Sequence, residues 1–142
     1  MQLVIGSVES TALDEFVNLF AGDYYIDPRM VANAIARRSI FNLIHNQTIL
    51  KVDCIVLKND EYRREEFARR RKVNLGDFET WIVSREDLII SKLFWARDSK
   101  SELQLRDVKN LLAADCDNDY LSSRAEKLGV KDLLNEVRAA HE

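Results

Sequence analysis

Histidine, cysteine, glycine and proline are all scarce in this chain of 142 residues, with two, two, four and one copies respectively. The two histidines, His45 and His141, lie far apart in the sequence, so a histidine-based metal site or catalytic triad has little support. The cysteines, Cys54 and Cys116, form no Cys-x-x-Cys pattern. They are expected to be buried thiols in a reducing cytoplasm, and neither a disulfide nor a zinc site is predicted.

Several functional signatures are also missing. The four glycines are isolated from one another, which excludes a glycine-rich phosphate loop. No apolar run approaches the roughly 18 residues that a membrane-spanning helix needs, and the start of the sequence does not resemble a signal peptide. The net charge of −3 supplies no basic field for nonspecific nucleic-acid binding. We expect a cytoplasmic protein that neither enters a membrane nor binds nucleic acid strongly.

A hydrophobic content of 46% and a charged content of 32% are typical of a globular domain, and the length fits a single domain over residues 1–142. Strands dominate residues 1–83 and helical patterns dominate residues 84–142. This order predicts an α+β fold, in which a mixed β-sheet flanked by helices is followed by about four C-terminal helices forming a bundle. Strands are expected at residues 2–5, 24–26, 39–45, 49–57, 72–75 and 78–83.

Local signals set the ends of these elements. Asp27-Pro28 predicts an N-cap followed by proline at the first helical position, and Thr11 with Asp14 predicts a capping box. Gly76-Asp77 predicts a tight hairpin, and a second hairpin is expected at residues 46–48. The strand at 49–57 is mostly apolar, which favours a central strand covered on both sides. Trp81 and Trp95 are expected in the core.

One carboxylate interrupts that central strand. In strand geometry Asp53 shares a face with Lys51 and Ile55, opposite the apolar residues on either side of it. A carboxylate placed there must project into a cleft or find a partner. The alternative to a functional cleft is a structural ion pair with Lys51 or a hydrogen bond to a loop.

Two further charges fall inside apolar helical stripes. Lys92 follows Leu88 by four residues, and Asp107 lies midway between Leu103 and Leu111, again at a spacing of four. A buried charge without a partner costs several kcal/mol, so such residues usually pair with or bind something. Two interpretations remain: a salt bridge between Lys92 and Asp107 on neighbouring helices, or a shared binding cleft.

A dense charged run precedes the second hairpin. Residues 61–72 mix acidic and basic side chains at helical spacings of three and four, which is typical of a solvated, ion-paired helix face. The alternative is a site for phosphate or an RNA backbone. Its basic residues would be Arg69, Arg70, Arg71 and Lys72.

Taken together, these segments resemble the nucleotidyltransferase-fold family that includes AbiEii-type toxins of abortive-infection and toxin–antitoxin systems. The resemblance spans nearly the whole chain. It rests on five motifs in order: Phe41-Asn-Leu-Ile-His45, Leu50-Lys-Val-Asp-Cys-Ile-Val56, Glu65-Glu-Phe-Ala-Arg-Arg-Arg71, Ser84-Arg-Glu-Asp-Leu-Ile-Ile-Ser-Lys-Leu93 and Gln104-Leu-Arg-Asp-Val108.

The resemblance implies a mixed sheet that presents carboxylates to magnesium, with helices closing a nucleotide cleft. Clustered carboxylates are needed there because two metal ions must neutralise a triphosphate and align the attacking hydroxyl. By this resemblance Asp53 is the third, strand-borne catalytic acid. Lys92 is similar to the helical lysine that contacts phosphate, and Asp107 to the catalytic carboxylate of the family's Arg-Asp motif.

The sequence departs from the family at its beginning. Family members carry a Gly-Ser turn and then an Asp-x-Asp strand. Aligning residues 3–5 with the end of that strand puts Gln2 where the second aspartate belongs, and the first would fall before Met1. A carboxamide brings no charge to offset that of magnesium. The expectation is a truncated or degenerate member, a pseudoenzyme that retains no metal site.

The functional expectation is therefore a nucleotidyltransferase-like protein with a residual cleft for a nucleoside triphosphate. The rival is a noncatalytic interaction module of a toxin–antitoxin type system, with an antitoxin protein as its partner. A third reading is an active nucleoside-monophosphate transferase that is completed by a missing N-terminal segment. Loss of that segment would leave a sheet edge or apolar groove less covered, which favours a homodimer.

Overall fold

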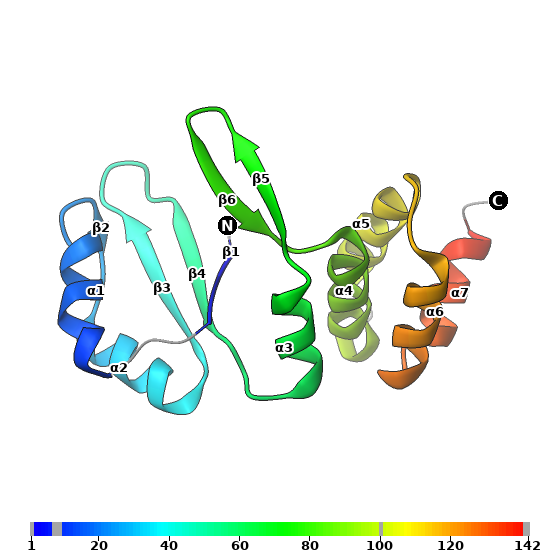
Figure 1. Cartoon of the computed structure of the whole chain (residues 1–142), viewed down its shortest axis with the longest axis horizontal. Coiled ribbons are helices and arrows are strands. Elements are labelled where there is room, and N and C mark those ends of the chain that lie inside the picture. The colour runs from blue at the N-terminus through cyan, green and yellow to red at the C-terminus, as the bar shows by residue number, and fades with distance from the viewer. Residues whose placement is uncertain (1, 7–9, 100, 141–142) are drawn as a thin grey trace. The chain divides into compact units, whose positions relative to one another are not determined.

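The computed structural model of this chain describes residues 2–6, 10–99 and 101–140. It is an α+β structure that divides into two compact units, residues 1–67 and 68–142 (Figure 1). None of the helices in these described ranges is both long enough and apolar enough to cross a membrane.

The first unit contains a mixed four-stranded sheet. The strands follow the order β1-β4-β3-β2, in which β1 runs parallel to β4 and the other neighbours are antiparallel. The strand at 49–57 was predicted to be central, and β4 does lie between two partners. The elements are β1 (Gln2–Ile5), a 3-10 turn (Ser10–Ala12), α1 (Leu13–Phe20), β2 (Tyr24–Tyr25), α2 (Pro28–Arg37), β3 (Ile40–His45), β4 (Lys51–Val56) and α3 (Glu61–Ala68).

Helices α1 and α2 supply the core of this unit together with one face of the sheet. Val31 of α2 is 1% exposed, Cys54 of β4 is fully buried, and the ring of Phe16 meets the edge of Phe41 at 5.9 Å between centroids. The alternation of β4 is strict, because Val52, Cys54 and Val56 are buried while the residues between them are half-buried or exposed. Full burial of both faces of this strand was expected, and only one face is fully buried.

Of the two helix N-terminal caps predicted in the first unit, one is present in the structure and the other is not. The Asp27 side chain accepts a hydrogen bond from the Arg29 amide at 2.8 Å, so the predicted N-cap before Pro28 is confirmed. The predicted capping box of Thr11 and Asp14 is wrong. A 3-10 turn precedes α1 there, and residue 12 takes the N-cap position without a side-chain hydrogen bond.

The second unit begins with a separate two-stranded sheet and continues into four helices. The hairpin was predicted at the right residues, but it belongs to its own sheet and not to the four-stranded one. Large apolar side chains from all four helices are buried, among them Leu93, Val108, Leu121 and Leu134. The elements are β5 (Arg71–Leu75), β6 (Phe78–Ile82), α4 (Arg85–Ser99), α5 (Glu102–Leu112), α6 (Asn118–Lys127) and α7 (Lys131–Ala139).

Both tryptophans were expected in the core, and this prediction is wrong. Trp81 is 53% exposed on β6, and Trp95 is 57% exposed on α4. Trp95 lies two residues after the fully buried Leu93 and directly before the buried Ala96. It therefore borders the apolar stripe of its helix and is not inside it.

Candidate functional site

Asp53 lies in the middle of a polar row that crosses three strands of the first unit. The register pairs Asp53 of β4 with Asn42 of β3 on one side and with Gln2 of β1 on the other. Asp53 and Asn42 are neighbours in register and share a face of the sheet, the one opposite the apolar core. One third of the Asp53 side-chain surface is exposed. This face therefore offers a carboxylate beside the amide of Asn42.

The surroundings of this carboxylate favour the structural interpretation. The ammonium Nζ of Lys51 lies 3.1 Å from Asp53 Oδ1, although not in hydrogen-bond geometry. Among the residues that the structure describes, Asp53 Oδ1 and Asn42 Oδ1 are buried oxygens that accept no hydrogen bond. Buried oxygens usually have a donor, so this pair has unused capacity for one.

The carboxylate also acts on its neighbour in the strand. Burial, followed by the negative charge of Asp53, raises the pKa of the Cys54 thiol to about 11. Cys54 is buried and Cys116 is half-buried, and both are unoxidised thiols. Burial also raises the pKa of Cys116, with a further contribution from the charge of Glu86. Neither thiol has the depressed pKa that a nucleophilic cysteine needs.

Lys92 and Asp107 form an ion pair between α4 and α5. Lys92 Nζ donates to Asp107 Oδ2 at 2.8 Å and to Gln104 Oε1 at 3.1 Å. The side chains of Lys92 and Asp107 are 22% and 37% exposed, so the pair lies at the border of the apolar stripe and in contact with water. From the sequence, both charged side chains were predicted to lie inside the apolar stripes of their helices. The hydrogen bond from Lys92, followed by the attraction of its charge, lowers the pKa of Asp107.

These three residues fall into different units. The structure brings Lys92 to Asp107 within the second unit, whereas Asp53 belongs to the first. The predicted convergence of all three on one hollow stays a prediction.

A buried polar cluster at the start of α4 was not anticipated. Asp87 is fully buried, and its carboxylate accepts from Ser84 Oγ at 2.5 Å, Tyr120 OH at 2.5 Å and Arg69 Nε at 3.0 Å. The Asp87 amide in turn donates to Ser84 Oγ at 3.1 Å, which is the hydrogen bond of an N-capping serine. The spacing Ser84-x-x-Asp87 was the signal in the sequence that would have found this cluster.

The cluster connects three elements of the second unit. The guanidinium of Arg69, just before β5, stacks on the Tyr120 ring at 3.8 Å to its centroid. Burial, then the hydrogen bond to Asp87, raises the pKa of Tyr120 to about 12. The adjacent Glu86 is 4% exposed and accepts from the Asp117 amide at 3.2 Å, with Arg71 Nη2 3.6 Å from its other oxygen. Both oxygens of Asp87 are occupied by these donors, so the cluster is structural.

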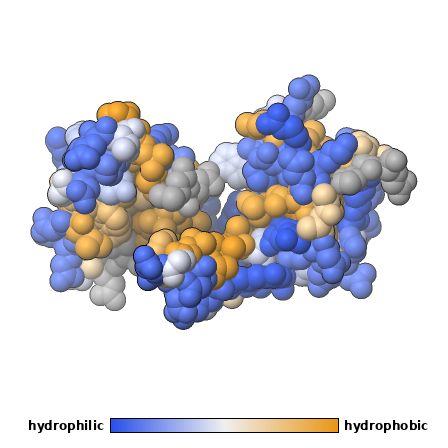
Figure 2. All heavy atoms as spheres, turned by 90° about the horizontal axis from the view of Figure 1, so that it is seen from above, coloured by the Kyte–Doolittle hydropathy of each residue, from blue (hydrophilic) through white to orange (hydrophobic). Residues whose placement is uncertain are grey.

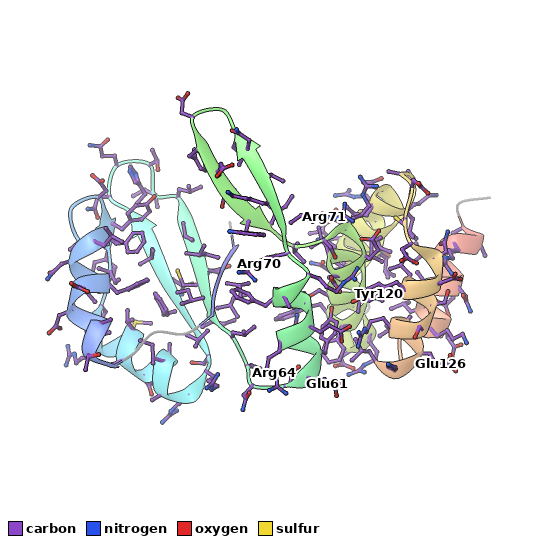
Figure 3. The ribbon with its side chains drawn as sticks, in the orientation of Figure 1. Glu61, Arg64, Arg70, Arg71, Tyr120 and Glu126 are labelled. Atoms are coloured by element: carbon purple, nitrogen blue, oxygen red, sulfur yellow. The ribbon has the colours of Figure 1, made fainter. Side chains whose placement is uncertain are left out.

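The basic run at residues 69–72 has partners of its own. Arg69 pairs with Asp87, Arg71 lies near Glu86, and Lys72 Nζ contacts Glu79 Oε2 at 2.5 Å. Arg70 stacks on the Trp81 ring at 4.8 Å to its centroid. Figure 3 labels Arg70 and Arg71 at the start of the hairpin and Tyr120 on α6. These pairings favour the ion-paired interpretation over a phosphate or RNA site.

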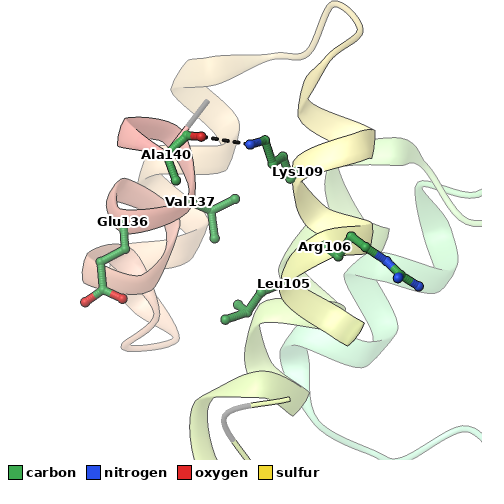
Figure 4. A pocket seen from close by; sticks show the side chains of 6 residues that line it. All are labelled: Leu105, Arg106, Lys109, Glu136, Val137 and Ala140. Atoms are coloured by element: carbon green, nitrogen blue, oxygen red, sulfur yellow. Dashed lines mark hydrogen bonds between the residues drawn. The ribbon is translucent and has the colours of Figure 1, made fainter. Parts of the chain in front are cut away.

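A shallow hollow of about 300 Å³ separates α5 from α7 (Figure 4). Its apolar floor comes from both helices, and Lys109 Nζ donates to the Ala140 carbonyl at 2.8 Å across one end. The hollow is lined by Leu105, Arg106, Lys109, Glu136, Val137 and Ala140. It contains one acidic side chain and two basic ones, and no group with the geometry of a nucleophile and base.

The described residues do not offer the donors that a two-magnesium centre needs. No three histidine, cysteine, aspartate or glutamate side chains in the described ranges are placed to hold a metal ion together. On the polar row of the sheet, Asp53 is the sole carboxylate, with Lys51 beside it. One carboxylate paired with an ammonium does not fit two divalent ions, so no catalytic step is derived through magnesium.

No protein-family description matches this sequence, and no curated protein matches it significantly. The geometry of the chain is therefore the basis for a functional proposal.

Proposed function

We propose that this protein is nucleotidyltransferase-like and binds a nucleoside triphosphate without transferring a nucleotide. The observation that carries the proposal is the register of β1 on β4. It places Gln2 directly beside Asp53, the position where the family resemblance expects a metal-binding aspartate. A strand in that position with an amide in place of an acid is what a degenerate member of such a fold would have.

The pair on α4 and α5 supplies a means of holding phosphate. Lys92 keeps its ammonium at the water-exposed border of the helices, held by Asp107 and Gln104. A phosphate that approaches this ammonium would gain a charge-assisted hydrogen bond. Asp107 would then fix the direction of the lysine, as a positioning residue.

A neighbouring aromatic side chain supplies a surface for a base. Trp95 follows Lys92 by three residues, so both lie on adjacent turns of one face of α4. More than half of the Trp95 surface is exposed. Stacking of a base on an aromatic ring contributes about 1–3 kcal/mol. Lys92 and Trp95 together therefore favour a ligand that carries both a phosphate and a base.

The absence of transfer follows from the donor set around Asp53. Lys51 already offsets the charge of this carboxylate, and Asn42, in register with it on β3, carries an amide. Amide oxygens are neutral ligands and do not compensate the charge of two divalent ions. The proposal is therefore that the protein binds a nucleoside triphosphate and does not transfer its nucleotide.

The experiment is a titration of the whole chain with each of the four nucleoside triphosphates, with and without Mg²⁺, followed by melting temperature and calorimetry. Ligand at 100 times its Kd stabilises a protein by about 2.7 kcal/mol, so binding should raise the melting temperature. Lys92→Ala should abolish the rise. Lys127→Ala, which removes the same charge from an exposed position on α6, should leave it unchanged.

Two outcomes contradict the proposal. One is a melting temperature that no triphosphate changes at millimolar concentration. The other is equal binding by the wild type and by Lys92→Ala. Incorporation of label from an α-labelled triphosphate into RNA or protein would contradict the noncatalytic part alone and would restore the transferase reading.

A second candidate is a noncatalytic interaction module of a toxin–antitoxin type system. It is favoured by the apolar side chains exposed on the second unit, notably Phe78 at 60% and Leu103 at 55%. Such exposure is typical of surfaces that another protein covers. Purification with a chromosomally encoded neighbour protein at fixed stoichiometry, in a complex that nucleotides leave intact, would distinguish this candidate from the first.

A further inference from the structure

The hairpin β5–β6 has one apolar face that is open in the structure. Its register pairs Leu75 with Phe78 and Arg71 with Ile82, and these residues share a face because they stand four apart, an even number, along each strand. Leu75, Phe78 and Ile82 are 54%, 60% and 46% exposed. Figure 2 shows this apolar surface as orange spheres near the centre of the view.

This hairpin is a small sheet. Within the described ranges β5 and β6 pair only with each other, so each strand has one open edge. A two-stranded hairpin is marginally stable in water, and three or more strands are usually needed. An open edge beside an apolar face is also a template for pairing with another chain. The hairpin is therefore suited to gaining a further strand.

The turn determines which backbone groups face the open edge of β6. Gly76 has a φ of +70° in a two-residue loop, the geometry of a tight hairpin turn with glycine in its first central position. Leu75 and Phe78 then form the closing hydrogen-bonded pair. Because such pairs alternate along an antiparallel ladder, Glu79 and Trp81 direct their N–H and C=O groups away from β5.

We propose that two copies of this chain associate through β6, which pairs antiparallel with β6 of the second copy about a two-fold axis at Thr80. The four strands β5, β6, β6 and β5 then form one continuous sheet. Glu79 of one copy stands opposite Trp81 of the other, and these are the residues whose backbone groups face outward. The hydrogen-bond pattern of the hairpin and that of the dimer are thus compatible.

The side chains of β6 complement themselves in this arrangement. Phe78 of one copy meets Ile82 of the other, and Thr80 meets Thr80. Aromatic–β-branched pairs and Thr–Thr pairs are both favourable across antiparallel strands. The pairing brings the exposed ring of Phe78 and the methyl groups of Ile82 into contact side by side, in the self-complementary manner of a two-fold interface.

Charge complementarity supports the same register. On the opposite face, the Arg70 guanidinium lies 4.8 Å from the centroid of the Trp81 ring. Glu79 of the second copy, placed beside Trp81, brings a carboxylate next to that guanidinium. No two like charges stand opposite each other on the central strands, because Glu79 is the only ionisable residue in β6. A homodimer is therefore favoured over a partner of another kind.

Cysteine cross-linking tests the proposed two-fold axis at Thr80 directly. In a Cys116→Ser background, Thr80→Cys places two thiols across a non-hydrogen-bonded pair, where Cα atoms lie about 4.5 Å apart. Mild oxidation should convert most of this variant into a covalent dimer that reductant dissolves. The matched control is Val73→Cys, directly opposite Thr80 within the hairpin but on β5, which should remain monomeric on a nonreducing gel.

Proline substitution tests whether the open edge of β6 forms the dimer contact. Glu79→Pro removes an outward N–H that the hairpin does not use, so it should convert the dimer to monomer in light scattering at 10–100 μM, roughly the range for a modest interface. Asn74→Pro makes the same change in the residue directly opposite, on the β5 edge, and should leave the dimer intact. Circular dichroism checks that both variants fold.

The proposal is overturned if the wild-type chain is a monomer at these concentrations, or if Val73→Cys cross-links as efficiently as Thr80→Cys. Loss of the dimer in Asn74→Pro alone would assign the contact to β5 and would also overturn it. Because none of these readouts involves nucleotide, failure here leaves the proposed nucleotide binding untouched.

Discussion

Tyr120 of α6 donates its hydroxyl hydrogen to Asp87 of α4 at 2.5 Å, across 33 residues of sequence. This hydrogen bond joins the first turn of α6 to the first turn of α4, and the Asp87 carboxylate that accepts it is fully buried. An unpaired buried carboxylate is costly, so removal of a donor from the cluster around Asp87 should destabilise the second unit.

The first prediction removes that donor. Tyr120→Phe keeps the ring beneath Arg69 but leaves Asp87 Oδ1 without its hydrogen bond, so the free energy of unfolding should fall by about 1–3 kcal/mol. Urea denaturation followed by circular dichroism measures it. Tyr25→Phe is the matched control, because Tyr25 is 61% exposed, and it should change stability by less than about 0.5 kcal/mol. Equal effects of the two variants would refute the structural importance of the cluster.

The second prediction concerns acid stability. Lys92 lowers the pKa of Asp107 in the folded state below its usual value, so the charged carboxylate favours folding. This contribution is fully present above the ordinary aspartate range and disappears as the pH falls through the lowered pKa. Lys92→Met should therefore flatten the decline of unfolding free energy on acidification. Carboxyl NMR titration of Asp107 in both proteins provides the check, and an unchanged titration midpoint would contradict it.

The third prediction concerns thiol reactivity. With a pKa of about 11 and no exposed surface, Cys54 is almost entirely protonated at pH 8 and shielded from reagents. About one molecule in a thousand would carry the reactive thiolate. Iodoacetamide should leave Cys54 unmodified in the native protein and label it in urea, as peptide mass spectrometry would report. Rapid labelling without denaturant would show that the first unit opens readily.

The fourth prediction concerns the end of α6. Gly129 has a φ of +66°, and the amide of Val130 donates to the Ala125 carbonyl at 2.8 Å, which is the helix-ending Schellman pattern. Gly129→Ala should cost about 1–2 kcal/mol, because a Cβ disfavours this left-handed backbone. Gly22→Ala, at an ordinary φ with nothing within 4 Å of the new Cβ, should be neutral or stabilising. Thermal melts compare the two.

Short-range signals predicted much of the fold. The Asp27-Pro28 cap, the Gly76-Asp77 turn and the alternation around Cys54 each depend on chemistry within a few residues, and each appears in the structure. Thr11 failed as a capping residue because a 3-10 turn precedes the helix. Propensity does not distinguish these two ways of starting a helix.

Contacts between residues far apart in the sequence were harder to predict. Sequence spacing put Lys92 and Asp107 inside apolar helical stripes and offered their ion pair as one of two interpretations, beside a shared cleft. It gave no means of seeing that Tyr120 reaches Asp87, because that contact depends on how α6 packs on α4. The exposure of Trp95 was misjudged for the same reason, since an aromatic residue beside an apolar stripe is compatible with either environment.

The parallel pairing of β1 with β4 has a consequence for the order of folding. Strand β1 has no neighbour in the sheet until residues 51–56 have been synthesised, whereas β3 and β4 are joined by a short local turn. Contacts between distant segments form late because a large loop must close first. A ribosome-bound chain would therefore complete the β3–β4 ladder before β1 docks beside β4.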